Sequence, residues 1–493
     1  MIKKNVDLPL EIDLFIDNKW IPSLRGQRFK RFNPADGELV VSVAQANAED
    51  ALRAVQAARS AFDHGPWPRT SPAERAGVLI RAAGLIEENK ERLAVYESAT
   101  CGAPLNQTLM MMDWIVDVFF YFAGISRTVA GETHLFTEQE IGLTFKEPVG
   151  VVSQLIPWNF PLNQAAWKIC PALAAGCTIV AKPDIKTAVT TLILGELLAE
   201  AGLPKGVLNV ITGDPADLSS VLTEHPDIDM VSLTGSTTSG KTVMRNAAAS
   251  VKRVHLELGG KSPNLVFAGA DLDAAARSTA SSVFFRSGQI CTAASRVLVE
   301  ESVHDEFLEL FEKHAAQMTV GDPKDSSSVL GPMISEEQMR RVEDYIDVGV
   351  RSGARKVVGG KRLSGGIFDN GYYLPPTIFD HVDPGMAIAQ EEIFGPVASV
   401  LTFRDAEDAI TLANQTIYGL ASAVWTSDIS TALQMSRRLK AGTVWINAYG
   451  LVHAELPVGG YKMSGHGREL GVQGLDEYLQ TKSVHFNLTQ LGG

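Results

Sequence analysis

Cysteine is scarce in this chain, and so are long apolar runs. Four cysteines stand among 493 residues, which argues against a disulfide-stabilised scaffold and suits a reducing compartment. No apolar run reaches ~18 residues, the length that crosses a bilayer as a helix. The N-terminal segment also lacks the apolar stretch of a signal peptide. We therefore expect a cytoplasmic protein with no membrane partner.

Basic charge is also in short supply. Lysine and arginine total 44 against 57 aspartates and glutamates, which gives a net charge of −13, and no Lys/Arg-rich run occurs. This balance argues against a nucleic-acid partner, and no metal site is expected. What is present is an ordinary globular mix of 45% hydrophobic and 20% charged residues. The length suits about two to four domains.

The order of expected strands and helices indicates an α/β fold. Two amphipathic helices come first, at 44–62 and 72–100. From residue 148 onward, β-rich runs alternate with helical ones, which is typical of a parallel sheet. The alternation resumes after about residue 260 and predicts a second α/β domain. The expected strands are 148–157, 177–183, 207–213, 229–235, 253–260, 398–403 and 443–447, with helices near 161–174, 187–202 and 303–318.

One cysteine differs from the others in its surroundings. Cys291 lies in SVFFRSGQICTAASRV (282–297), among small and polar residues, whereas the other three stand in apolar company. A free cysteine is usually a small buried hydrophobe. A single cysteine is also a candidate nucleophile if the fold brings a base to it. Both readings stay open for Cys291 at this point.

A phosphate-binding pattern occupies residues 235–242, GSTTSGKT. It satisfies G-x-x-x-x-G-K-[ST] between an expected strand and an expected helix, where free N–H groups favour an anion. A P-loop NTPase also needs an acidic strand end to hold Mg²⁺, and neither IVAKPD nor VLTFRD is a good candidate. The NTPase stays a remote alternative, beside an ordinary capped helix start.

Six stretches considered together are more specific. They are IPWNFP (156–161), SLTGST (232–237), LELGGKSP (256–263), SGQICTA (287–293), EEIFGP (391–396) and PVGGYKMSGHGRELG (457–471). In this order and spacing the chain resembles the aldehyde dehydrogenase superfamily from about residue 13 to the C-terminus. The resemblance implies oxidation of an aldehyde to a carboxylic acid through a thiohemiacetal and a thioester, with hydride passing to NAD(P).

The resemblance gives four residues catalytic roles. Cys291 matches the nucleophile, because a thiolate attacks an aldehyde carbon readily. Asn159 matches a donor that stabilises the oxyanion together with the backbone N–H of Cys291. Glu257 matches the general base, and Glu469 a carboxylate that relays protons to it. Taken alone, Glu257 reads as a surface carboxylate and Asn159 as a turn residue, and for Glu469 a surface pair with Arg468 stays open.

The cofactor residues also follow from the resemblance, since no G-x-G-x-x-G follows the first strand. NAD-restricted members usually carry a glutamate three residues after the lysine that matches Lys182. This chain has Ile185 there, followed by Lys186, so we expect NADP to be accepted along with NAD. Asp184 partly cancels this charge, and a solvent-facing Lys186 stays open. The implied cofactor-binding residues are Ile156, Pro157, Trp158, Lys182, Lys186, Gly235, Ser236, Leu258, Gly259, Glu392 and Phe394.

The implied substrate pocket is roomy and largely apolar. It predicts a medium or large apolar or aromatic aldehyde as the small-molecule partner. The segment YGLVHAELPVGG (449–460) is also similar to betaine aldehyde enzymes, which leaves an aminoaldehyde as the alternative. The implied pocket residues are Trp114, the Asp117–Tyr121 turn, Phe160, Asn163, Gln164, Trp167, Phe285, Ile290, Thr292 and the 449–455 loop with Tyr449.

The resemblance also implies a division of the chain. Residues 1–125 and 149–259 are assigned to a Rossmann-like dinucleotide-binding domain with a parallel sheet. Residues 260–463 form a catalytic α/β domain. Residues 126–148 and 477–493 form a small β oligomerisation arm, which implies a homodimer or a homotetramer.

Overall fold

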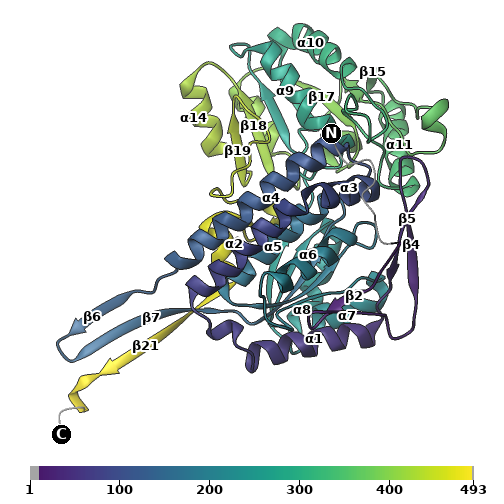
Figure 1. Cartoon of the computed structure of the whole chain (residues 1–493). Helices are drawn as coiled ribbons and strands as arrows, with labels where there is room; N and C mark the ends of the chain where they lie inside the picture. Colours follow the sequence, from purple (N-terminus) through teal and green to yellow (C-terminus); the bar gives the residue numbers. More distant parts are fainter. Residues whose placement is uncertain (1–9, 491–493) are drawn as a thin grey trace.

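The computed structural model describes residues 10–490, and within them an eight-stranded sheet carries most of the helices (Figure 1). Five central strands are parallel, and the strands at both ends are antiparallel to their neighbours. In spatial order the strands are β20 (Gly465–His466), β12 (Arg253–Glu257), β11 (Met230–Thr234), β8 (Val151–Ile156), β9 (Thr178–Pro183), β10 (Leu208–Val210), β2 (Leu14–Ile16) and β3 (Lys19–Ile21).

Helices cover both faces of this sheet. Val152 and Ile179 belong to one core, with α2, α4, α5 and α6, whereas Val151 and Val180 belong to the other, with α1, α7 and α8. Burial on both faces explains why these strands read as apolar runs. The helices are α1 (Ala48–Asp63), α2 (Pro72–Glu88), α3 (Lys90–Cys101), α4 (Leu105–Ile125), α5 (Pro161–Ala175), α6 (Val189–Glu200), α7 (Pro215–Glu224) and α8 (Thr237–Ala248).

Helix ends are set by local caps rather than by the apolar period. The helix predicted at 44–62 begins four residues later, because Asn47 caps α1 with its side chain. The helix predicted at 72–100 is two helices, α2 and α3, which meet at Asn89. Gly102 then ends α3 in the left-handed conformation with φ 79°.

The long apolar helix α4 corrects two expectations. Leu105–Thr128 forms a 24-residue helical segment that is long and apolar enough to cross a membrane by length and composition, and 39% of its most apolar 18 residues are buried. The expectation that no apolar stretch has this length is therefore wrong. The expected turn at Asp117–Tyr121 is also wrong, since it lies inside α4. The buried side of α4, with Phe119 and Phe122, packs into the core beside α2 and α5.

The second half of the chain forms a seven-stranded sheet. All its strands are parallel except β15 at one edge. Its strands in order are β15 (Arg355–Val358), β16 (Thr377–Asp380), β17 (Val397–Phe403), β14 (Arg296–Glu300), β13 (Pro263–Val266), β18 (Ala421–Trp425) and β19 (Thr443–Ile446). Its helices are α9 (Leu272–Phe284), α10 (His304–Ala316), α11 (Glu336–Arg351), α12 (Ala387–Gln390), α13 (Ala406–Asn414) and α14 (Ile429–Arg438).

An antiparallel arm projects from the body of the molecule (Figure 1). It consists of β21 (Leu479–Asn487), β7 (Glu140–Pro148) and β6 (Thr133–Thr137), with β7 in the middle. The short helix α15 (Gly471–Asp476) precedes β21. A further small sheet joins β1 (Glu11–Ile12), β5 (Leu39–Ala44) and β4 (Arg28–Phe32).

Candidate active site

The carboxyl ends of three neighbouring strands bring the polar residues of the first sheet together. Asn159 follows the end of β8, Gly235 follows β11, and Glu257 is the last residue of β12. Glu257 pairs in register with Thr234 of β11. The carboxyl ends of adjacent parallel strands form one edge of a sheet, where ligands bind in open α/β folds.

Cys291 follows a tight turn at the end of α9. Arg286 and Ser287 both adopt left-handed backbone angles, with φ 53° and 55°, at a cost of about 1 kcal/mol or more each. Gly288 has φ 70°, and a Cβ there would lie 2.0 Å from the carbonyl oxygen of Gly395. Strained backbone of this kind is concentrated at functional sites, and here it presents a half-buried thiol.

Asn159 is bonded directly to this turn. Its Nδ2 donates to the carbonyl oxygen of Gln289 at 3.0 Å. The side chain of Gln289 accepts from the backbone N–H of Ile334 at 2.9 Å, which fixes the turn to the second half of the chain. An asparagine amide carries two N–H donors. One is used by Gln289, so the other is available to an oxygen held at Cys291.

Burial sets the protonation states of the thiol and the nearby carboxyl. Although Cys291 is only half-buried as a residue, burial raises the pKa of its thiol to about 12, with Glu392 and Glu257 adding to the rise. Burial also raises the pKa of Glu257 well above its usual range; Glu469 adds to this and Lys168 opposes it. A protonated thiol needs a base before it can attack, and a carboxylate with a raised pKa is a better base.

A buried polar group lies behind Glu257. Lys168 on α5 donates to Glu469 Oε1 at 2.5 Å and to Ser232 Oγ at 3.1 Å. Ser232 Oγ lies 2.9 Å from His255 Nδ1. All four members of this group are buried. The surface ion pair left open for Glu469 is therefore wrong.

The sequence analysis missed three members of this group. The available signal was a polar residue inside an otherwise apolar element: Lys168 within AAWKICPALA, Ser232 within DMVSLTG and His255 within RVHLELGG. Such residues need buried partners, but the sequence does not say which ones.

The phosphate-binding pattern forms an ordinary capped helix start. Ser236 caps α8 and accepts from the backbone N–H of Ser239 at 3.1 Å. Lys241, the lysine of the pattern, is exposed. Across residues 10–490, no group of three His, Cys, Asp or Glu side chains is placed to hold a metal ion. The N–H groups at this helix start suit an anion. An NTPase would also require an acidic residue that holds Mg²⁺ beside it.

Known proteins match this arrangement along nearly the whole chain. Residues 20–484 match the model of the Aldehyde dehydrogenase family. The betaine aldehyde dehydrogenase of Bacillus subtilis (strain 168) is 44% identical over 476 residues, covering 96% of this chain and 97% of the relative. The chain belongs to the aldehyde dehydrogenase family.

Solved structures agree with this. The NAD-dependent aldehyde dehydrogenase from Sinorhizobium meliloti has a TM-score of 0.96 and 44% identity, covering 97% of this chain and 95% of that chain. The indole-3-acetaldehyde dehydrogenase of P. syringae, solved as a mutant with NAD⁺ and IAA, has a TM-score of 0.96 and 43% identity, covering 98% of each chain. The enzyme is therefore an α/β aldehyde dehydrogenase with a cofactor sheet and a catalytic sheet.

The residues predicted to bind the nicotinamide end of the cofactor lie close to one another. A Cβ at Gly259 would lie 2.1 Å from Glu392 Oε2, so only glycine fits there. The N–H of Gly260 donates to Glu392 Oε1 at 3.1 Å. Burial raises the pKa of Glu392 to about 7. Trp158 and Phe394 pack edge to face with centroids 5.2 Å apart. The Gly260 N–H thus holds the Glu392 carboxylate in one orientation beside the glycine at position 259.

The adenosine side carries charges of both signs. Lys182 is buried, and burial lowers its pKa, while Asp184 and Asp214 counter that effect. Lys182 makes no side-chain hydrogen bond within residues 10–490, so it is free for a ribose or a phosphate. Lys186 Nζ lies 3.9 Å from Asp184 Oδ1. This separation is that of a weak ion pair between partly exposed groups, and the partial cancellation of the Lys186 charge by Asp184 stays a prediction.

Aromatic residues from separate elements flank the thiol. The hydroxyl of Tyr449 donates to the carbonyl oxygen of Thr292 at 2.5 Å, and its ring packs on Trp445 at 4.6 Å. This fixes the loop after β19 beside the nucleophile. Inside α5, Gln164 Oε1 and Trp167 Nε1 are buried without partners in the described chain. The half-buried members of the predicted pocket are Trp114, Tyr121, Phe160, Phe285, Ile290, Thr292, Tyr449 and Val452.

The side chain of Arg286 is buried between Phe160 and Cys101. Its guanidinium lies 4.6 Å from the ring centre of Phe160, and Nη1 donates to Cys101 Sγ at 3.2 Å. Arg286, Cys101 and Asn159 line a space of about 250 Å³. Part of Phe160 is thus used to cover a buried arginine.

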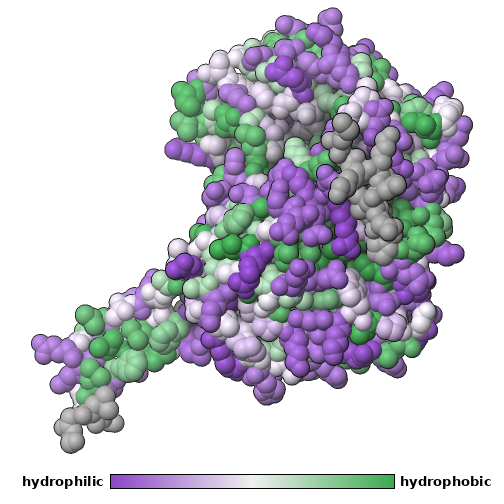
Figure 2. Space-filling model, in the orientation of Figure 1, coloured by the Kyte–Doolittle hydropathy of each residue, from purple (hydrophilic) through white to green (hydrophobic). Residues whose placement is uncertain are grey.

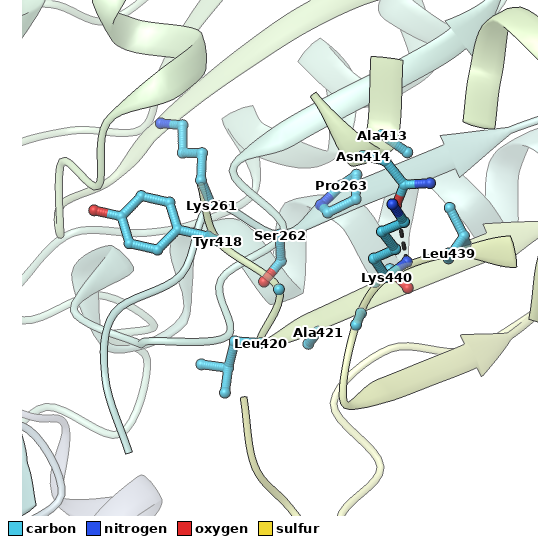
Figure 3. A pocket seen from close by; sticks show the side chains of 13 residues that line it. Lys261, Ser262, Pro263, Ala413, Asn414, Tyr418, Leu420, Ala421, Leu439 and Lys440 are labelled. Carbon is cyan, nitrogen blue, oxygen red and sulfur yellow. Dashed lines mark hydrogen bonds between the residues drawn. The ribbon is translucent and has the colours of Figure 1, made fainter. Parts of the chain in front are cut away.

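Another space, of about 240 Å³, lies beside the LGGK segment (Figure 3). Its lining includes Lys261, Ser262 and Tyr418 but neither Cys291 nor Glu257. In Figure 3 the side chain of Lys261 extends away from Ser262. Burial lowers the pKa of Lys261 to about 7. This space is separate from the residues that carry the chemistry.

Proposed function

We propose that the enzyme oxidises its aldehyde through a thioester on Cys291, with Glu257 as the base and Asn159 as the oxyanion donor. One observation carries this assignment. The bond from Asn159 to Gln289, 3.0 Å long, places the donor beside the turn that ends at Cys291. The charge of Glu257 reaches the same thiol, since it raises the thiol pKa.

Acylation begins with a proton transfer. Glu257 takes the thiol proton, and the thiolate sulfur attacks the carbonyl carbon of the aldehyde. The carbonyl oxygen becomes an oxyanion, which the free N–H of Asn159 and the backbone N–H of Cys291 stabilise. As the oxyanion reforms the carbonyl, the carbon gives up a hydride, for which NAD(P)⁺, when bound, would supply the acceptor. A thioester remains on Cys291.

Deacylation uses water and the same carboxylate. Glu257 accepts a proton from a water molecule whose oxygen attacks the thioester carbon. The carbon–sulfur bond breaks, the carboxylic acid leaves, and the sulfur is free for another cycle. The Lys168–Glu469 pair lies behind Glu257. We infer that Glu469 receives the proton that Glu257 must shed.

Cys291→Ser tests the nucleophile. We expect this variant to lose aldehyde oxidation while it still binds NAD⁺, measured by steady-state turnover and by equilibrium titration. Cys170→Ser is the matched control, because Cys170 is fully buried in α5. Turnover near the wild-type rate in Cys291→Ser would contradict the proposal.

We propose a medium or large apolar or aromatic aldehyde as the substrate. The predicted pocket supports this through Trp114, Trp167, Phe285 and Tyr449, which offer large apolar surfaces from different elements. The P. syringae relative, named for indole-3-acetaldehyde, supports the same class. A panel of aldehydes compared by kcat/KM tests it, and preference for short aliphatic aldehydes would contradict it.

An aminoaldehyde is the second candidate because of one charge. The carboxylate of Glu455 lies near enough to Tyr121 to raise its pKa, after burial as the main cause. A carboxylate beside an aromatic ring suits a cationic ligand. The B. subtilis relative named for betaine aldehyde supports this class as well. Glu455→Gln should lower kcat/KM for a cationic aldehyde and leave that of a neutral aromatic one unchanged.

We also propose that NADP is accepted along with NAD. Ile185 places no carboxylate three residues after Lys182, and the free Lys182 ammonium is available to a phosphate. The charges of Asp184 and Asp214 near Lys182 limit the preference for NADP. A cytoplasmic location is proposed on the low cysteine content, with all four cysteines free.

A homodimer or homotetramer is proposed from the exposed arm. Leu135 and Phe136 of β6 are 76% and 58% exposed, and Phe145 of β7 and Phe486 of β21 are also exposed. Figure 2 shows this apolar surface on the arm. An open sheet edge with apolar side chains is an association surface unless something covers it. A second copy of the chain supplies such a cover.

A further inference from the structure

We propose that His255 is a positioning residue for the general base Glu257 and acts through the hydroxyl of Ser232. His255 and Glu257 are two residues apart in β12, so their side chains leave the same face of the sheet. Ser232 is the register partner of His255 on β11. This inference rests on the assignment of Glu257 as the base.

The direction of each hydrogen bond follows from the donors available. Lys168 can only donate, and it donates to Glu469 Oε1 at 2.5 Å and to Ser232 Oγ at 3.1 Å. The single hydrogen of Ser232 must then go to another acceptor. His255 Nδ1 lies 2.9 Å away and is that acceptor. The chain of bonds therefore runs from Lys168 through Ser232 to His255, with the imidazole proton on Nε2.

The surroundings keep His255 neutral, as an acceptor must be. Burial lowers its pKa well below the usual range, and the charges of Lys168, His466 and Arg468 lower it further. Glu469 Oε1 lies 3.7 Å from Nδ1 and is already engaged by Lys168. The titratable groups that face this cluster are Lys168 from α5, Glu257 from β12, His466 from β20, and Arg468, Glu469 and Tyr478 from the segment that follows.

The fold leaves room for this imidazole at one glycine. Gly467 has φ 96°, and a Cβ there would lie 2.0 Å from Cδ2 of His255. A side chain at position 467 would thus displace the ring. The neighbouring strand pairing of Leu256 with His466 holds the glycine against the ring.

Loss of the His255 imidazole affects the pKa of Glu257 through the charge of Lys168. Lys168 lowers the pKa of Glu257, whereas Glu469 raises it. Without the imidazole, the Ser232 hydroxyl loses His255 Nδ1 as the acceptor for its hydrogen, and its bond from Lys168 weakens. A less firmly held ammonium favours the Glu257 carboxylate less, so the pKa of Glu257 rises. Deacylation then requires a higher pH.

The test measures the pH dependence of the slow phase that follows the burst of reduced cofactor. His255→Leu removes the acceptor, and Ser232→Ala removes the bridge. We expect both to move the midpoint of the acidic limb upward by about half a pH unit or more. His255→Asn keeps an acceptor oxygen near the place of Nδ1 and should restore the wild-type midpoint. Ser153→Ala is the matched control. Ser153 on β8 is as buried as Ser232, but it lies on the other face of the sheet, as the register partner of Val231.

Several results would overturn this role. An unchanged midpoint in His255→Leu and Ser232→Ala would do so, as would a downward shift. A shift in His255→Asn as large as that in His255→Leu would also exclude the acceptor role. The amplitude of the burst measures how much folded enzyme with a working nucleophile is present, independently of the slow phase. If His255→Leu does not fold, the midpoint of Ser232→Ala alone tests the proposed role. Absence of any burst in the wild type would instead refute the proposed thioester mechanism.

Discussion

At the scale of single residues, Glu257 combines burial with a neighbouring carboxylate. Both raise its pKa, so its basic form accumulates only as the pH rises through that raised value. Glu257→Gln keeps the shape but cannot accept a proton. Because Glu257 is the proposed base in both steps, we expect a slower burst of reduced cofactor, followed by turnover slowed roughly 10²-fold or more, measured by rapid mixing. Deacylation should suffer more than acylation.

The control for this variant is Glu257→Asp, which retains a carboxylate on a shorter side chain. It should keep part of the turnover and a pH-dependent slow phase. Loss of the burst in Glu257→Gln with unchanged deacylation would assign the carboxylate to acylation alone.

Asn159 supplies a donor that matters only once the oxyanion forms. Asn159→Ala should therefore lower kcat by roughly 10²-fold, the usual scale for one oxyanion donor. Steady-state kinetics with a saturating cofactor measure the effect. Asn163→Ala, in the first turn of α5 and four residues after Asn159, is the comparison and should change KM rather than kcat. A change confined to KM in Asn159→Ala would make it a binding residue.

Residues within short motifs were predictable, and pairs between distant segments were not. Cys291, Glu257 and Asn159 stand in stretches whose spacing is specific. The Lys168–Glu469 bond joins positions 301 residues apart, and no local pattern encodes it. The side-chain direction of Arg286 likewise depends on Cys101, 185 residues away.

At the scale of elements, strands were more predictable than helix ends. Strands such as β8 and β9 are buried on both faces, so they appear as apolar runs whatever surrounds them. Helix ends depend on caps such as Asn47. The predicted turn at Asp117–Tyr121 failed because α4 carries apolar residues on most of its surface, which hides the helical period.

We expect the connection between β9 and α6 to decide the choice between NAD and NADP. Ile185 lies in it, between Lys182 and the start of α6. A carboxylate there, ~4 Å from a 2′-phosphate at an effective dielectric near 20, would cost up to about 4 kcal/mol per charge pair. Even ~1.4 kcal/mol is tenfold in affinity. Ile185→Glu should therefore move the kcat/KM ratio towards NAD by tenfold or more, mainly by weakening NADP binding.

The matched control is Ile185→Gln, which has a similar size and no charge. It should leave the ratio near that of the wild type. A wild type that uses NAD alone, or an unchanged ratio in Ile185→Glu, would place the 2′-phosphate elsewhere.

At the scale of the whole molecule, the arm stands out because it projects from the body of its own chain (Figure 1). It touches the body where β7 and β21 meet the first sheet, and its far end projects into solvent (Figure 1). All five residues of β6 are exposed. Burying apolar surface contributes about 25 cal/mol per Å², and a stable interface buries roughly 800 Å² on each partner. A second chain that covers the arm would bury its apolar side chains and pair the free N–H and C=O groups of its edge strand.

Charges on the arm should therefore change the assembly. Leu135→Lys combined with Phe136→Lys places two ammonium groups on β6, where a covering chain would have to desolvate them. We expect this variant to elute as a monomer by size-exclusion chromatography with light scattering, and we expect the wild type to have two or four times the mass of one chain. Leu24→Lys is the control, because Leu24 is 53% exposed in a loop outside the arm. It should leave the mass unchanged. A wild type that is monomeric at micromolar concentration, or an arm variant that keeps the wild-type mass, would show that the arm is not the association surface.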